Sequence, residues 1–242
     1  MGAVTTKVSS FGVVSTTFYT LLNYIKENDG DNLNVCEVGC LDGKYTIPFL
    51  KRGYNVDAFD MNMIYLYGGH VQLPIIKDDD NVILQRRTIY GAEDRINIEE
   101  LHEKVKLYSD NFFKCNHKQY DVVYSKRVLH REEYADISMK DKILALQNAV
   151  KEGGIMYIEY LMFLDDNNSE GLNTNQYIKQ CEMQKYFSTG WEILSIVEDR
   201  NCIIEKPHIG NPTFHKHRVG MIKVRKNKNH VPNYFDINLK FD

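Results

Sequence analysis

The feature that most constrains this chain is an apolar strand pattern that runs into a glycine-bearing turn at residues 35–43, Val-Cys-Glu-Val-Gly-Cys-Leu-Asp-Gly. Glycine allows a tight bend and lets the backbone approach a ligand without a Cβ in the way. A short helix is expected from Asp42 to about Arg52, and the unpaired N–H groups of its first turn favour a ligand carboxylate or phosphate. This strand–turn–helix unit predicts a ligand site at the carboxyl end of a buried strand.

Asp60 ends the next expected strand, residues 55–60, and lies 21 positions after Gly39. An acidic side chain there accepts hydrogen bonds from the ribose hydroxyls of a nucleoside; the structural alternative is a helix N-cap. A nicotinamide-binding fold uses the same device, but its G-x-G-x-x-G fingerprint needs a glycine where this chain has Leu41. Glu37 suits a cationic ligand better than an anionic one, unless it only caps buried backbone groups.

The rest of the chain alternates helical and extended patterns, which favours an α/β fold with a largely parallel sheet. The first helix is the clearest, because its apolar residues recur with helical spacing behind an N-cap at Ser15 or Thr16. The Gly153-Gly154 pair is expected to end a later helix. The expected elements are helices at residues 15–27, 141–151 and 174–187, and strands at residues 105–109, 120–125, 155–161, 191–198 and 218–225.

The segment at residues 61–104 is long for one crossover connection, and we interpret it as an insertion. It contains Gly68-Gly69, the acidic run at residues 78–80 and an expected helix near Ile98–Val105. It is either a surface elaboration or a functional element such as a lid, an acceptor-recognition element or an oligomer contact. The chain is otherwise expected to form a single domain over residues 1–242, with residues 1–30 as an N-terminal helical lid region.

These motifs together resemble the class I S-adenosylmethionine-dependent methyltransferases. Their E/D-x-G-x-G-x-G turn is matched by Glu37, Gly39 and Gly43, with Leu41 replacing the middle glycine, and their acidic second-strand end by Asp60. The stretches at residues 109–112, 120–125, 128–130 and 151–157 match the later motifs in order. The tail, from the strand at 191–198 through His215-Lys216-His217-Arg218 to the last strand, resembles the small-molecule branch of tellurite- and thiopurine-type enzymes.

The resemblance implies a Rossmann-like, doubly wound, seven-stranded sheet that is mostly parallel with an antiparallel last strand. It also implies S-adenosyl-L-methionine as cofactor, with Asp110 near the adenine amine; the alternative for Asp110 is a turn-forming role. Ser125 and Lys126 follow the fourth strand at the sheet edge where open α/β sheets bind ligands. The predicted cofactor-binding residues are Glu37, Gly39, Cys40, Gly43, Asp60, Met61, Asp110, Asn111, Ser125 and Lys126.

Three residues are candidates for catalysis on the acceptor side. His130 is the best general base, because histidine titrates near neutral pH, although a packed structural histidine would look the same in sequence. Glu159 and Tyr160 end the fifth strand and are predicted to face the acceptor. The predicted activity is transfer of a methyl group from S-adenosylmethionine to the O, N or S atom of an unidentified small molecule.

Composition excludes some alternatives and leaves others open. The net charge of −3, from 30 basic and 33 acidic residues, gives no global attraction to nucleic acid, so an RNA acceptor is disfavoured. A catalytically silent binding module and a nicotinamide-dependent oxidoreductase remain as rivals. Five cysteines without a C-x-x-C pair favour reduced thiols and a cytoplasmic location, and no apolar run is long enough to span a membrane. His208, His215 and His217 suggest a metal only weakly, so no metal is expected.

Overall fold

The computed structural model describes residues 8–77, 81–163, 176–199, 201–209 and 215–228. The chain falls into two compact units, which are described separately. The first unit comprises residues 1–110 and 205–215, and the second comprises residues 111–204 and 216–242. The single-domain organisation stays a prediction. None of the helices in the described ranges is long and apolar enough to span a membrane.

Three parallel strands form the sheet of the first unit: β1 (Asn34–Val38), β2 (Asn55–Phe59) and β5 (Val105–Tyr108). Their order is β5-β2-β1, with Val38 opposite Phe59 and Phe59 opposite Tyr108. Most side chains of β1 and β2 are buried, as their continuous apolar runs predict for a parallel sheet covered on both faces. Because the three strands run in the same direction, the residues that follow them emerge at one edge of the sheet.

The helices of the first unit are α1 (Thr16–Asp29), α2 (Thr46–Lys51), α3 (Met63–Tyr67) and α4 (Ala92–Ile98). Helix α1 confirms the sequence prediction: Ser15 caps it by accepting a hydrogen bond from Phe18 N, and the apolar stripe that includes Phe18 is buried. Phe18 packs edge-on against Phe49 of α2, with ring centroids 5.0 Å apart. Helix α2 starts at Thr46, four residues later than predicted, because the backbone from Asp42 onward first completes the turn.

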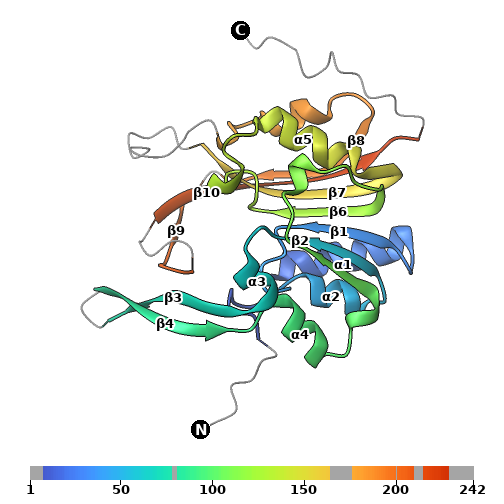
Figure 1. The fold of residues 1–242 in the computed structure, drawn as a ribbon. Coiled ribbons are helices and arrows are strands. Elements are labelled where there is room, and N and C mark those ends of the chain that lie inside the picture. Colours follow the sequence, from blue (N-terminus) through green and yellow to red (C-terminus); the bar gives the residue numbers. More distant parts are fainter. Residues whose placement is uncertain (1–7, 78–80, 164–175, 200, 210–214, 229–242) are drawn as a thin grey trace. The chain divides into compact units, whose positions relative to one another are not determined.

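The predicted insertion contains an antiparallel hairpin, β3 (Gly69–Ile76) and β4 (Val82–Ile89), which extends away from the parallel strands of its unit (Figure 1). The acidic run at residues 78–80 lies outside the described residues. The prediction of a helix near Ile98–Val105 is wrong. Helix α4 ends at Ile98, and in this range only the 3₁₀ turn η1 (His102–Lys104) follows. Glu100, with φ of 58°, takes a left-handed conformation that interrupts helix propagation there.

Four strands form the sheet of the second unit, in the order β6 (Tyr120–Lys126), β7 (Val150–Met162), β10 (His215–Lys226) and β8 (Trp191–Glu198). Strands β6 and β7 are parallel, whereas β10 is antiparallel to both of its neighbours. The short strand β9 (Ile203–Glu205) pairs with β10 and was not predicted. All seven strands expected from the sequence are therefore present, three in the first unit and four in the second.

Two helix predictions in the second unit need correction. Helix α5 (Met139–Asn148) ends before the Gly153-Gly154 pair, which lies inside β7, where the pairing with β6 shifts register. Gly153, with φ of 77°, supplies the bend for this irregularity instead of a helix end. In the described part of the helix expected at residues 174–187, the 3₁₀ helix η5 (Met183–Phe187) forms instead, since Cys181 has a left-handed φ of 60°. Residues 174 and 175 lie outside the described residues.

Candidate functional site

The turn after β1 is held in a conformation that normally requires glycine at three positions. Gly39, Leu41 and Gly43 all have positive φ, of 81°, 54° and 76°. The N–H groups of Gly39 and Cys40 both donate to the carbonyl of Phe59, at 2.8 and 3.0 Å, which ties the turn to the end of β2. Leu41 therefore keeps the left-handed geometry despite its side chain, at a cost of about 1–2 kcal/mol.

Asp60 stabilises this turn through its carboxylate. Its Oδ2 accepts a hydrogen bond from Leu41 N at 3.0 Å, and its Oδ1 accepts one from Asn62 N at 2.9 Å. The N-cap of α3 is Asn62, so the helix-cap alternative for Asp60 does not apply. A carboxylate accepts several hydrogen bonds at once. At the carboxyl end of a parallel strand it suits hydroxyl donors such as those of a ribose.

Glu37 is the second carboxyl of the site, and its environment differs from that of Asp60. It is fully buried, and its Oε2 accepts a hydrogen bond from Thr46 Oγ1 at 2.5 Å. Its Oε1 is buried without a hydrogen-bond partner among the described residues. Burial raises the pKa of Glu37 to about 8, and the nearby carboxylates of Asp60 and Asp42 add to the rise, while the Thr46 hydrogen bond opposes it. An unsatisfied oxygen of this kind fits a ligand ammonium, which would both pair with the carboxylate and favour its charged form.

Asp42 is a central residue of the site that the sequence analysis missed. Its Oδ1 accepts hydrogen bonds from Ser9 Oγ at 2.7 Å and from Arg95 at 3.0 Å, and its Oδ2 accepts one from Ser10 N at 2.7 Å. Arg95 also donates to the Asp42 carbonyl at 2.6 Å. Lys44 Nζ adds a bond to the Phe11 carbonyl at 2.7 Å. The turn therefore holds both the N-terminal segment and α4; only the acidic side chain inside a glycine turn could have indicated this.

The other predicted cofactor residues near this turn are placed as follows. Cys40 is fully buried, so its side chain contributes packing to the turn. Met61 is partly exposed directly after Asp60. Asp110 is exposed beyond the end of β5, and in the second unit Asn111 caps the 3₁₀ helix η2 (Phe112–Lys114) by accepting a bond from Phe113 N. Binding roles for these four residues stay predictions.

The second unit contains the other predicted site residues, and four of them lie at the end of β6 and within β7. Glu159 is buried and forms ion pairs with Lys126 Nζ at 2.7 Å and with Arg127 Nε at 2.6 Å. Ser125 is fully buried, and its Oγ has no hydrogen-bond partner among the described residues. The ion pairs give Lys126 and Glu159 a structural role that the sequence did not indicate.

His130 is half-buried and Tyr160 is fully buried, with different consequences. Burial, together with the positive charges of Arg131 and Arg127, lowers the pKa of His130 to about 3, so the ring is neutral at pH 7. Its Nδ1 is buried without a hydrogen-bond partner among the described residues. Tyr160 is fully buried and donates to Glu198 Oε1 at 3.0 Å. Its ring lies against Gly220 of β10, where a Cβ would come within 2.2 Å of it.

Comparison with known proteins identifies the class of this fold. A family model described as a methyltransferase domain matches residues 15–205, which is most of the chain. The chain belongs to this family. It is 24% identical over 211 residues to a ubiquinone biosynthesis O-methyltransferase of Rickettsia typhi, covering 83% of this chain and 74% of the relative.

Solved structures share the fold at low sequence identity. TehB from Haemophilus influenzae matches with a TM-score of 0.59 and 17% identity, covering 86% of this chain. This chain spans 62% of the TehB chain, less than two thirds of its length. Magnesium protoporphyrin IX methyltransferase from Synechocystis PCC 6803, solved with bound S-adenosylmethionine, matches with a TM-score of 0.53 and 13% identity, covering 87% of this chain and 78% of that one.

A third structural match is 1,6-didemethyltoxoflavin-N1-methyltransferase from Burkholderia thailandensis, with a TM-score of 0.52 and 11% identity, covering 88% of this chain and 79% of that one. The predicted fold class is confirmed: a Rossmann-like α/β fold whose seven-stranded sheet is mostly parallel and has an antiparallel last strand. The predicted enzyme class, an S-adenosylmethionine-dependent methyltransferase, is confirmed as well.

Proposed function

We propose that this chain methylates a small-molecule acceptor and that the turn after β1, with Glu37 and Asp60, holds its cofactor. The observation that carries the proposal is the pair of complementary carboxyls in the first unit. Asp60 directly follows β2 and is a carboxyl of the kind that binds ribose hydroxyls, and Glu37 has a buried oxygen that lacks a donor among the described residues. S-adenosylmethionine carries both kinds of donor, ribose hydroxyls and an ammonium group.

The chemistry divides between the cofactor and the protein. When bound, S-adenosylmethionine would supply a methyl group on its sulfonium sulfur, and the nucleophilic atom of the acceptor would take that methyl in line as the carbon–sulfur bond breaks and S-adenosylhomocysteine leaves. Glu37 would neutralise the ligand ammonium, and Asp60 would fix the ribose while it continues to support the turn through Leu41 N. These roles orient the reactive group, and neither carboxyl exchanges a proton with the acceptor.

On the acceptor side, we assign a hydrogen-bonding role to His130. A pKa of about 3 keeps its ring neutral, so it accepts a hydrogen bond at pH 7, but the same low value makes it a weak proton acceptor. His130 would therefore orient an acceptor O–H or N–H, and the proton would leave through water. Glu159 and Tyr160 would act as positioning residues, because Glu159 pairs with Lys126 and Arg127 and Tyr160 donates to Glu198.

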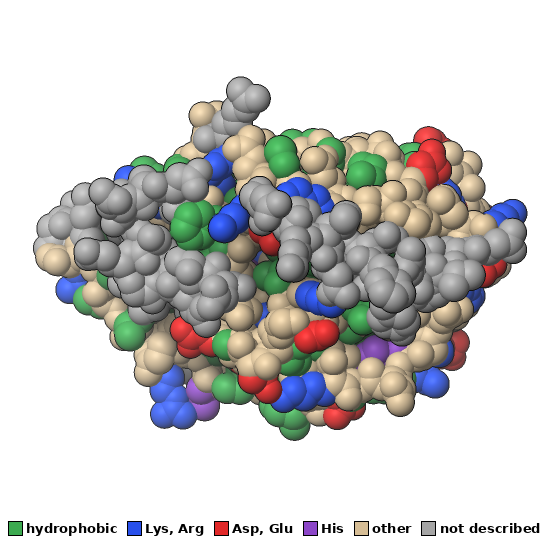
Figure 2. Space-filling model, turned by 90° about the horizontal axis from the view of Figure 1, so that it is seen from above, with side chains coloured by type: hydrophobic (Ala, Val, Ile, Leu, Met, Phe, Trp, Pro, Cys, Tyr) green, Lys and Arg blue, Asp and Glu red, His purple; other side chains and the backbone are tan. Residues whose placement is uncertain are grey.

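Small molecules are the favoured acceptors. One relative is named for the biosynthesis of ubiquinone, and two structural matches are named for magnesium protoporphyrin IX and 1,6-didemethyltoxoflavin. All three compounds are small molecules. On the face drawn in Figure 2, basic and acidic side chains of the described residues are interspersed. A nucleic-acid surface needs clustered positive charge, and the net charge of −3 gives no global attraction to RNA.

Calorimetric titration with S-adenosylhomocysteine tests the cofactor site. We expect Glu37→Gln and Asp60→Asn each to weaken binding at least about tenfold, since each removes a charge-assisted hydrogen bond. Glu103→Gln, an exposed carboxyl on η1 of the same unit, is the matched control and should bind like the unaltered chain. Unchanged affinity in both site variants would refute the assignment.

Transfer of an isotope-labelled methyl group tests the acceptor class. The labelled cofactor is incubated with the enzyme and with separated cell fractions of small molecules, RNA and protein. Label in the small-molecule fraction is the expected result. Label found in RNA or protein alone would overturn the small-molecule proposal while leaving the cofactor site intact.

A further inference from the structure

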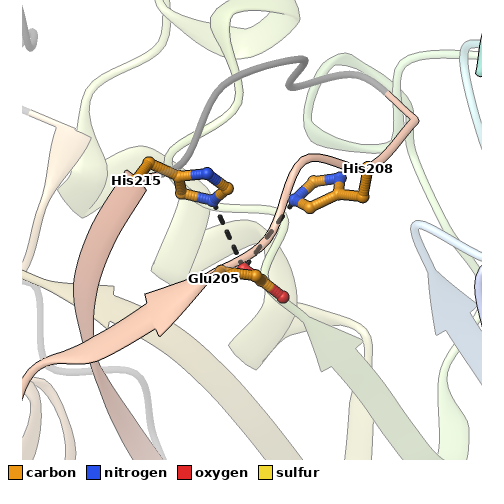
Figure 3. Close-up of side chains that lie close together, drawn as sticks. All are labelled: Glu205, His208 and His215. Atoms are coloured by element: carbon orange, nitrogen blue, oxygen red, sulfur yellow. Dashed lines mark ion pairs between the residues drawn. The ribbon is translucent and has the colours of Figure 1, made fainter. Parts of the chain in front are cut away.

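Three side chains of the first unit converge on one point beside β10. Glu205 ends β9, His208 follows three residues later, and His215 begins β10. Their candidate ligand atoms all lie within 4.8 Å of one another. Nε2 of His215 is 3.3 Å and Nε2 of His208 is 3.8 Å from the same oxygen, Oε2 of Glu205 (Figure 3). The H-x-H spacing in the sequence groups these histidines with His217 instead, but His217 is buried within β10.

The cluster is explained either by direct hydrogen bonds between the histidines and Glu205 or by a metal ion that all three residues bind. The distances between the atoms distinguish these two explanations. A direct charge-assisted hydrogen bond between imidazolium and carboxylate has an N···O distance of about 2.7–2.9 Å, shorter than either distance here. Two ligands bound tetrahedrally to one zinc ion, with metal–ligand bonds of about 2.0–2.2 Å, lie about 3.3–3.5 Å apart. The His215–Glu205 distance falls in that range, and the His208–Glu205 distance exceeds it by a few tenths of an ångström.

The hydrogen bond of His208 also favours a metal ion over a direct hydrogen bond to Glu205. Its Nδ1 lies 2.8 Å from the carbonyl oxygen of Ile209, which only accepts, so Nδ1 carries the proton. In the neutral ring, Nε2 then presents a lone pair toward the Glu205 carboxylate. Metal-binding histidines have this arrangement, with one ring N–H bonded to a carbonyl and the other nitrogen directed at the ion.

Packing fixes this segment in its unit. Ile209, next to His208, is buried in a cluster with Tyr65 and Ile89, and Leu41 of the turn packs against that cluster. The three ligand side chains themselves are between 23% and 46% exposed, so an ion can reach them from solvent. The buried side chain of Ile209 holds the adjacent His208 in place before the ion binds.

We propose that Glu205, His208 and His215 form a binding site for a divalent first-row transition metal ion, with Zn²⁺ as the best match to two imidazoles and a carboxylate. The ion would cross-link the end of β9 to the start of β10. Its fourth ligand would be water or a polar group of a bound molecule. The proposal does not depend on the cofactor site, because none of its three ligands belongs to that site.

The test uses the full chain after treatment with a chelator. Zn²⁺ is titrated in competition with a chromophoric chelator, and Co²⁺ is titrated separately for its visible absorption spectrum. We expect one ion per chain and a tetrahedral Co²⁺ spectrum. His208→Ala and His215→Ala should each weaken binding about 100-fold or more, and Glu205→Gln at least about tenfold. His102→Ala, an exposed histidine on η1, is the matched control and should bind like the unaltered chain.

Three outcomes would overturn the proposal. The first is no saturable binding at concentrations near those of the protein in the titration. The second is binding that survives the double variant of His208 and His215. The third is a thiolate-to-cobalt charge-transfer band, which would assign the ion to the exposed cysteines Cys115, Cys181 and Cys202. Circular dichroism of each variant verifies that a loss of binding is not a loss of folding.

Discussion

Glu37 leads to a prediction that needs no knowledge of the acceptor: cofactor binding should release a proton from the protein. With a pKa of about 8, the Glu37 carboxyl of the free protein is about nine-tenths protonated at pH 7. A ligand ammonium beside it stabilises the carboxylate, so the proton leaves on binding. The ligand amino group, with a pKa of about 7.7–8.0, takes up only about 0.1 proton. We therefore expect a net release of about 0.8 proton per site.

Calorimetry in several buffers measures this release directly. The binding enthalpy of S-adenosylhomocysteine at pH 7 is plotted against the ionisation enthalpy of each buffer, and the slope is the number of protons exchanged. Glu37→Gln keeps the size of the side chain but has no proton to lose, so its slope should fall to the small uptake by the ligand. Glu103→Gln should keep the slope of the unaltered protein. Absence of release, or release that persists in Glu37→Gln, would refute the reasoning.

The same carboxyl should destabilise the free protein as the pH rises. Its pKa in the folded chain lies above its ordinary value of 4.5. The contribution of Glu37 to the unfolding free energy is therefore lost as the pH rises from 4.5 to 8. His130 acts oppositely: its pKa lies below its ordinary value of 6.5, so its contribution to stability is lost as the pH falls from 6.5 to about 3. Above pH 6.5 the effect of Glu37 is therefore nearly unopposed by His130. Between pH 6.5 and pH 8, urea unfolding should show a loss of about 1.5 kcal/mol that Glu37→Gln lacks.

Three further predictions concern the packing around the turn. Leu41→Gly should change the unfolding free energy by less than about 1 kcal/mol, because relief of the left-handed strain offsets lost burial and added chain entropy; a loss above about 2 kcal/mol in urea unfolding would contradict this. Gly91→Ala should destabilise the chain by about 1–3 kcal/mol, since its Cβ would lie 2.2 Å from Gly68 N, and an unchanged melting temperature would refute that contact. Arg95→Met should cost about 3–5 kcal/mol by leaving Asp42 buried without its cation, and chemical unfolding that matches the unaltered chain would count against this ion pair.

The parallel strands were predictable from sequence because burial on both faces leaves a continuous apolar run. The predicted bounds at residues 55–60 and 120–125 agree with β2 and β6 to within one residue. Helix α1 was predictable because one face packs in the core and its apolar spacing records that face. In each case the local pattern reflects a single, uniform environment.

The hairpin β3–β4 was not predictable in this way. Most of its side chains are exposed or half-buried, so its sequence has neither the continuous apolar run of a buried strand nor a clean alternation. The end of α5 was missed for another reason. A glycine at position 153 is compatible with either a helix end or a bend in a strand. Only the pairing of β7 with β6 decides that it bends a strand.

At the candidate site, the sequence motif indicates which residue types are present but not their charge or their partners. Glu37 and Asp60 are both buried acidic residues near strand ends, yet one oxygen of Glu37 lacks a partner among the described residues, whereas two backbone N–H groups hydrogen-bond Asp60. The spacing His215-x-His217 suggested two ligands in one loop, but the strand buries His217 and brings Glu205 to His215 instead. In both cases the sequence supplies the chemical groups, while their charge and their partners depend on which neighbours exclude water. The two proposals therefore depend on tertiary contacts, and substitutions that preserve the motif but alter those contacts are their sharpest tests.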